Sequence, residues 1–245
     1  PNGIQVTRNF PPIKGVDPDD HAYMHPGLSL GFAVLDGENF WHNDRGVVVH
    51  EGFVGEPTAG NSASFCARNR YVRQDGSTIC MEEATYTLTT NKDGYLITLD
   101  TQFSSNRSFS FGVKEEMGLA LRVASPIRVK EAGGSILSAN GGRDEKGTWG
   151  IVDQWWDYFG EIEGKKVGLQ IMSGPGNPEV WAHSRDYGVL VANPFPVDLK
   201  ANRDKMTVVE PNKPFRLRFG VQVHESKDFN PSASHTRYLE ATAHE

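Results

Sequence analysis

The sequence predicts an all-β protein, a single large antiparallel β-sandwich that spans residues 1–245. Three observations predict this fold. Over much of the first half of the chain, apolar residues recur at every second position, which is typical of strands with one buried face. Short runs rich in Asp, Asn and Gly separate these segments, as turns separate antiparallel strands. The composition, 38% hydrophobic residues with 26 Gly and 14 Pro, indicates a folded chain dense in turns, and a β domain of this length usually forms one unit.

The chain opens with an irregular lead-in, residues 1–20, which contains one short predicted strand at residues 4–8. A loop that ends at Pro26 and Gly27 then leads into a strand at residues 28–35. Consecutive antiparallel strands follow, and turns separate them at residues 75–76, 91–94 and 105–107. The predicted ranges of these strands are residues 46–54, 64–73, 78–90, 95–104 and 109–113.

The second half of the chain alternates less clearly. Residues 138–147 are interpreted as a polar hairpin tip or loop, and residues 196–204 as a short loop or helical turn. From residue 225 a polar tail is predicted, in which residues 238–240 suit a last helical turn. The strands predicted in this half are residues 166–173, 189–192 and 215–224.

The chain has two cysteines, Cys66 and Cys80. If Asp75-Gly76 forms a two-residue hairpin turn, the residues that pair have numbers that add up to 151. Cys66 then lies opposite Thr85 and Cys80 opposite Tyr71, on opposite faces of the ribbon. Because the two thiols point apart, we expect no disulfide and interpret both as small core residues rather than metal ligands.

Charge and sequence patterns disfavour several classes of partner. The net charge is −6 and basic residues never cluster beyond two neighbours, so we expect no nucleic-acid partner. The longest nearly apolar run, residues 27–35, is about half the length that a membrane-spanning helix needs. No phosphate-binding glycine motif is present, and no cofactor is expected. No signal-peptide pattern opens the chain, so such a segment is absent or already removed, and the compartment stays open.

A dense group of functional side chains precedes the strand at residues 189–192. An indole, an imidazole, a guanidinium, a carboxylate and a phenol follow one another at Trp181, His183, Arg185, Asp186 and Tyr187. Functional sites are commonly built from polar side chains in the loop that precedes a strand. The alternative is a strand-entry loop in which the two charged residues pair and the tryptophan fills the core.

Two earlier segments have the same character. His21 and His25 suit a general base, two ligands of sugar hydroxyls or two metal ligands, or else they cap their loop. No carboxylate stands at a convincing ligand spacing, so no metal is expected. Lys114 and Glu115, with Arg122 shortly after, suit either acid–base chemistry with stabilisation of negative charge or a structural ladder of ion pairs.

A fourth segment, residues 154–160, places four aromatic residues around Asp157. Tryptophan and tyrosine offer flat contact area to sugar rings. The alternative is that alternate residues face the core, so we expect one of Trp155 and Trp156 to be buried.

These segments resemble the signatures of the PmoA-like domain family, a family of unknown function common in bacterial carbohydrate-utilisation loci. The first match is to its pattern around W-H-x-R-D-Y-G, here with Ala182 inserted after the tryptophan. The matching residues are Asn177, Pro178, Trp181, His183, Arg185, Asp186, Tyr187, Gly188, Asn193, Pro194 and Phe195. Further matches are His21, His25, Gly27, Leu28, Phe40, Trp41, Lys114, Glu115, Arg122 and the aromatic segment. By analogy, the resemblance and the long strands suggest a sandwich of the sugar-mutarotase type.

The resemblance implies an enzyme that acts on a carbohydrate as a hydrolase, lyase or epimerase, with the four segments meeting on one concave face. We expect His183 or His25 as base, Glu115 as proton donor or acceptor, and Lys114 and Arg122 as stabilisers of an oxyanion. The expected substrate-binding residues are His21, Arg122, Trp156, Asp157, Arg185, Asp186, Tyr187 and Asn193.

Two other functions remain open from the sequence. A non-catalytic carbohydrate-binding module would use the same aromatic and polar residues without perturbed titratable groups. A methane-oxygenase-like protein, which the family label suggests, is disfavoured because no segment is long enough to span a bilayer. The sugar and the oligomeric state are not specified by the sequence.

Overall fold

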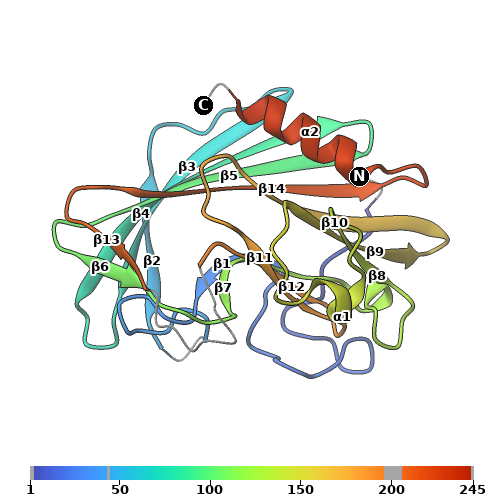
Figure 1. The fold of residues 1–245 in the computed structure, drawn as a ribbon, viewed down its shortest axis with the longest axis horizontal. Helices are drawn as coiled ribbons and strands as arrows, with labels where there is room; N and C mark the ends of the chain where they lie inside the picture. The colour runs from blue at the N-terminus through green and yellow to red at the C-terminus, as the bar shows by residue number, and fades with distance from the viewer. Residues whose placement is uncertain (1–2, 43–44, 196–205, 244–245) are drawn as a thin grey trace.

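A computed structural model describes residues 3–42, 45–195 and 206–243, and it confirms the predicted all-β sandwich. Two antiparallel sheets form the sandwich, and a two-stranded ribbon lies beside them (Figure 1). The large sheet has the order β2 (Val47–Phe53), β3 (Ser62–Val72), β4 (Thr78–Asn91), β5 (Gly94–Ser104), β14 (Phe215–Glu225), β10 (Lys165–Ser173), β9 (Trp155–Ile162), β8 (Ser135–Ser138). The small sheet has the order β1 (Leu28–Phe32), β7 (Met117–Arg122), β12 (Val189–Asn193), β11 (Trp181–Arg185). The ribbon pairs β13 (Thr207–Val209) with β6 (Phe109–Phe111).

The hairpin register predicted around the Asp75-Gly76 turn is confirmed. Cys66 pairs with Thr85 and Tyr71 with Cys80, and both cysteines are free thiols. The long strands β2 to β5, β10 and β14 lie within about two residues of their predicted ranges, which is the usual uncertainty of strand ends.

Other elements differ from the prediction. Residues 4–8 form no strand and contribute only an isolated bridge between Thr7 and Val123. Strands β7, β8, β9, β11 and β13 were not predicted as strands, and a short helix, α1 (Asp144–Thr148), follows the loop at residues 138–143. The loop or turn predicted at residues 196–204 lies outside the described residues.

The predicted polar tail is instead a helix, α2 (Pro231–Thr242), which crosses the large sheet on the side away from the small sheet (Figure 1). Its Tyr238 is fully buried. Glycines leave room for this ring, because a Cβ at Gly220 or Gly174 would lie 2.8 or 2.4 Å from its atoms. The helix begins at Asn230, whose side chain accepts a hydrogen bond from the Ala233 amide.

The core between the sheets is built around phenylalanine rings. Phe32 contacts Phe103 at 5.4 Å between ring centroids and Phe111 at 5.0 Å, both edge-to-face. Phe111 stacks on Phe195 at 4.7 Å. Since these rings come from β1, β5, β6 and the end of β12, they join both sheets and the ribbon into one core.

The small sheet turns its second face away from this core, and alternation along the strands decides which side chains lie there. Leu119 and Leu121 of β7 point into the core, so Ala120 and Arg122 point outward. The register places Ala120 in one row with His183, and Arg122 in the next row with Arg185. This outer face therefore collects an imidazole and two guanidinium groups from strands far apart in the sequence.

One glycine sets how closely the strands of this sheet approach. Gly118 has φ +120°, and a Cβ there would lie 2.2 Å from the Ala192 carbonyl oxygen and 2.9 Å from the Pro194 ring. We expect Gly118→Ala to lower the free energy of unfolding by roughly 2–4 kcal/mol, because it adds a steric clash to backbone strain. Gly164→Ala is the control, since Gly164 has φ +75° with open space around it and should lose only about 1 kcal/mol. Equal losses in urea unfolding would contradict this account.

Candidate functional site

Three of the four segments singled out in the sequence meet on the outer face of the small sheet. His21 stacks on Tyr187 with 5.6 Å between ring centroids, and His25 lies 5.1 Å from His21. The Arg122 guanidinium lies over the Tyr187 ring at 5.0 Å. Glu115 joins the group through an ion pair with Arg185 at 3.5 Å. Side chains from the loop before β1, from β7 and the segment before it, and from β11 and the turn after it thus form one cluster.

A buried arginine and a carboxylate hold His21 in place. Arg122 donates through Nη2 to both carboxylate oxygens of Asp20, at 3.1 and 2.8 Å. Burial opposes ionisation of Asp20, but the hydrogen bond and charge of Arg122 outweigh it and hold the pKa of Asp20 below its ordinary value. The Asp20 carboxylate lies 3.2 Å from Nδ1 of His21. An ionised carboxylate only accepts hydrogen bonds, so Nδ1 of His21 carries the proton and Nε2 has a free lone pair.

The loop that carries the two histidines is strained and firmly held. His21 and His25 have φ angles of 51° and 59°, which are unusual for residues other than glycine. Arg8, whose side chain is fully buried, donates to the backbone carbonyls of Asp20, His21 and Met24 at 2.7, 3.0 and 3.2 Å. These bonds stabilise the loop in a conformation that keeps the His21 side chain 39% exposed.

Glu116, rather than the predicted Glu115, is the carboxyl group suited to donate a proton. Burial raises the pKa of Glu116, and the charge of Glu115 adds to this against opposing effects of His42, His21 and Lys114. Glu115 is 40% exposed and pairs with Arg185. The predicted role of proton donor therefore moves by one residue, because burial raises the pKa of the second of the two carboxyls. Lys114 is exposed and near enough to influence Glu116.

His183 is placed to donate a hydrogen bond, which differs from its predicted role as a base. Trp149 donates its indole N–H to Nδ1 of His183 at 3.2 Å. Burial and the charge of Arg185 lower the pKa of His183 to about 4, against the opposing charge of Glu145. The ring is therefore neutral near pH 7, and its single proton must lie on Nε2. In this tautomer no ring nitrogen remains free to take a proton.

His25 is a second buried, neutral histidine. Burial and the charge of Arg122, with smaller effects of His21, Arg8 and His183, lower the pKa of His25 to about 3. Its ring lies against the edge of Trp41, at 5.3 Å between centroids. In the part of the chain that the structure describes, Nδ1 of His25 has no hydrogen-bond partner.

Three predicted substrate-binding residues have structural partners instead. Arg185 pairs with Glu145 at 2.7 Å and lies over the Trp149 ring at 5.7 Å. Asp186 accepts a hydrogen bond from the Glu145 amide at 2.8 Å, in the first turn of α1. The fully buried Asn193 side chain donates to the backbone carbonyls of Lys114 and Glu115 at 2.8 and 3.3 Å. These residues position the site.

The fourth segment does not reach the cluster, so the expectation for Trp156 and Asp157 is not met. Trp156 is fully buried between the sheets, and Trp155 is buried as well, against Tyr238 on the other face, so the expectation that only one of the two is buried is wrong. Asp157 points to the other face of the large sheet, where it contacts Nε2 of His224 at 2.8 Å. The physical reason is that neither face of β9 borders the outer face of the small sheet. The partly exposed Trp149, which no sequence pattern singled out, supplies the aromatic surface instead.

Two further observations concern the described residues only. They contain no group of three or more His, Cys, Asp and Glu side chains arranged to hold a metal ion. None of their helices is long and apolar enough to cross a membrane.

Comparison with known proteins corrects the predicted family. A family model described as "Family of unknown function (DUF6807)" matches residues 1–234, and no PmoA-like family is found. No curated protein matches the chain. Among solved structures, the Slr1438 protein of Synechocystis sp. PCC 6803 is similar with a TM-score of 0.38 and 10% identity, over 71% of this chain and 66% of that one. A similarity this low does not assign the type of sandwich, so the sugar-mutarotase type stays a prediction.

The low pKa of His183 makes stability depend on pH. In the unfolded chain a histidine has a pKa of about 6.5. At a pH below that value the unfolded state binds a proton at this residue, whereas the folded state does not until the pH reaches about 4. Stability should therefore fall as the pH drops from about 6.5 towards about 4. We expect wild type to lose about 1–2 kcal/mol more than His183→Gln between pH 7 and pH 5 in urea unfolding. The exposed His50→Gln serves as control and should follow wild type. Parallel curves for all three proteins would contradict the assignment.

Proposed function

The chain belongs to DUF6807, a family of unknown function, and from its site we propose that it is an enzyme that acts on a carbohydrate by proton transfer. The observation that carries this proposal is the Arg122–Asp20–His21 chain beside the half-buried Glu116. It combines an oriented base with a carboxyl group whose pKa is raised. A carboxyl group with a raised pKa together with an imidazole that a carboxylate orients is typical of acid–base catalysis.

The roles follow from the protonation states. His21 takes a proton through its free Nε2, and ionised Asp20 stabilises the imidazolium that forms. Glu116 keeps its proton to a higher pH than an exposed carboxyl and donates it. His183 donates from Nε2, and together with the exposed Lys114 it stabilises an oxygen that gains negative charge.

This set of roles, with a base, a proton donor and a hydrogen-bond donor, favours an epimerase or lyase over a hydrolase. Removal of a proton from a carbon next to a carbonyl or carboxylate leaves an enolate oxygen, which needs hydrogen-bond donors beside the base. The neutral His183 ring is such a donor, since its lone pair is already occupied by Trp149. The rings of Tyr187 and Trp149, both partly exposed, offer flat surfaces of the kind that pack against sugar rings.

The experiment is a screen for proton exchange. Aldoses, keto-sugars, uronates and glycosides are incubated with the protein in D₂O and followed by NMR. Incorporation of deuterium at a carbon-bound position identifies the substrate of an epimerase or lyase, and release of a free sugar identifies hydrolysis. If no member of a broad panel exchanges or reacts, proton-transfer activity on sugars is refuted.

On the substrate so identified, we expect His21→Asn and Glu116→Gln each to lower kcat about 10²- to 10⁴-fold with KM changed only a few-fold, as removal of a positioned acid or base does. His50→Asn and Glu83→Gln are matched controls on the large sheet and should keep wild-type kinetics. Trp149→Ala should raise KM, because it removes a stacking surface, and should also lower kcat, because it frees Nδ1 of His183 and no longer fixes the tautomer that donates from Nε2.

A non-catalytic carbohydrate-binding module is the second candidate, and the partly exposed Tyr187 and Trp149 rings favour it. Calorimetry separates the two functions. If wild type binds a sugar without exchange or turnover, and His21→Asn changes only the affinity, the binding-module function replaces the enzymatic one.

A further inference from the structure

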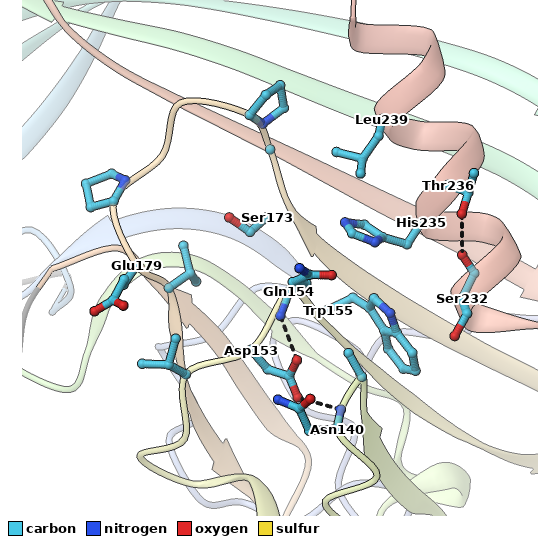
Figure 2. A pocket seen from close by; sticks show the side chains of 16 residues that line it. Asn140, Asp153, Gln154, Trp155, Ser173, Glu179, Ser232, His235, Thr236 and Leu239 are labelled. Carbon is cyan, nitrogen blue, oxygen red and sulfur yellow. Dashed lines mark hydrogen bonds between the residues drawn. The ribbon is translucent and has the colours of Figure 1, made fainter.

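A cavity of about 740 Å³ lies away from the candidate site, beside α2 and the start of β9 (Figure 2). One wall is the side of α2 that carries His235 and Leu239, and another is the loop between β10 and β11. The floor includes Trp155. This volume is within the range of about 300–1,000 Å³ that small-molecule sites occupy. The proposed enzymatic function makes no use of it.

The charged groups around the cavity are all acidic. Asp153 and Glu179 line it, and no lysine or arginine is among its described lining residues. Asp153 is 7% exposed, and each of its oxygens accepts one backbone hydrogen bond, from Asn140 at 2.9 Å and from Gln154 at 2.8 Å (Figure 2). The carboxylate is thus fixed in orientation, while each oxygen keeps a further lone pair for a ligand.

The α2 wall also presents acceptors. Figure 2 shows His235 pointing from the helix towards Ser173 and Trp155. Its ring donates one hydrogen bond to the Ser173 backbone, and burial lowers the pKa of His235 against the opposing effects of Ser173 and Asp153. The ring is therefore neutral near pH 7, and its second nitrogen is an acceptor. Thr236 already donates its hydroxyl proton to the Ser232 carbonyl at 3.2 Å, so its oxygen is left as an acceptor.

An anion would find little to bind here. The first turn of α2 offers no free amide at Ala233, since the Asn230 side chain accepts from it. A ligand that matches the cavity brings donors and positive charge to Asp153 and Glu179. It also brings an apolar surface, because the exposed Val152, Pro175 and Leu239 side chains lie along the wall.

We propose that this cavity binds a small ligand that carries a protonated amine on a ring-shaped or otherwise apolar body. The recognition chemistry is an ammonium group at the Asp153 carboxylate, with the body against Val152, Leu239 and the loop between β10 and β11. An amino sugar and a cyclic amine both satisfy this description, and the amine distinguishes them from neutral sugars.

Three probes that share a cyclohexane ring but differ in charge test the proposal. Cyclohexylamine, cyclohexanol and cyclohexanecarboxylate are titrated at pH 7 by calorimetry, with glucosamine and glucose as a second pair. We expect each amine to bind at least about 10-fold more tightly than its neutral partner, and the carboxylate to show no binding. Equal affinity for cyclohexanol and cyclohexylamine, preference for the carboxylate, or no binding of either amine at millimolar concentration would each overturn the proposal.

A pair of lysine substitutions on α2 locates the site. Leu239→Lys places a positive charge at the cavity wall, whereas Ala241→Lys adds the same charge on an exposed position of the same helix that does not line the cavity. We expect Leu239→Lys to weaken cyclohexylamine binding at least about 10-fold and Ala241→Lys to leave it within about two-fold. Both variants are compared by thermal unfolding, and Asp153→Asn offers a second test without added bulk. Binding that survives both Leu239→Lys and Asp153→Asn would show that the amine binds elsewhere.

Discussion

The charge of Arg122 is the constraint on which the candidate site depends. Its side chain is fully buried at the end of β7, and a buried guanidinium is costly unless a carboxylate and further contacts compensate it. Asp20 supplies the carboxylate and Tyr187 the ring face. Asp20 belongs to the lead-in, so this ion pair adds to the Thr7–Val123 bridge in fixing an otherwise irregular segment to the small sheet, and it places His21 on the outer face. Strand β7 is consequently buried on both sides, by the core on one and by this cluster on the other.

Clear turns and β-branched residues, rather than exposure to solvent, decided which strands could be predicted from the sequence, since the predicted β12 is buried at every position just as β7 is. Strands β2 to β5, β10 and β14 alternate or carry long β-branched runs between clear turns, and the residue pairs around Asp75-Gly76 followed from the turn alone. Strand β7 contains no β-branched residue, which weakens its β signal although Met117, Leu119 and Leu121 alternate with small or polar residues. Most of helix α2 was not predicted, because most of its surface is polar. Its buried Tyr238 fills a space on the sheet that two glycines, distant from it in the sequence, leave open.

The residue types of the site could be predicted, but their partners could not. Glu115 and Glu116 are adjacent in sequence, and only tertiary burial raises the pKa of the second, so that it holds its proton more firmly than an exposed carboxyl. Trp156 looked like a stacking surface because it lies among aromatics, yet the pleat of β9 turns it into the core. Trp149 had no pattern around it at all. The one signal that was available is Asp20, which directly precedes His21 and fits the well-known need of a catalytic imidazole for an orienting carboxylate.

The three histidines of the cluster show how burial divides roles among identical side chains. His25 and His183 are buried near arginines, so a proton on either ring would be both desolvated and repelled, and they stay neutral as hydrogen-bonding groups. His21 differs in two respects: solvent reaches it, and its nearest charged partner is a carboxylate. Arg122 and Arg8, which oppose a proton on His25, also favour the ionised form of Asp20 beside His21, whereas Arg185 opposes a proton on His183.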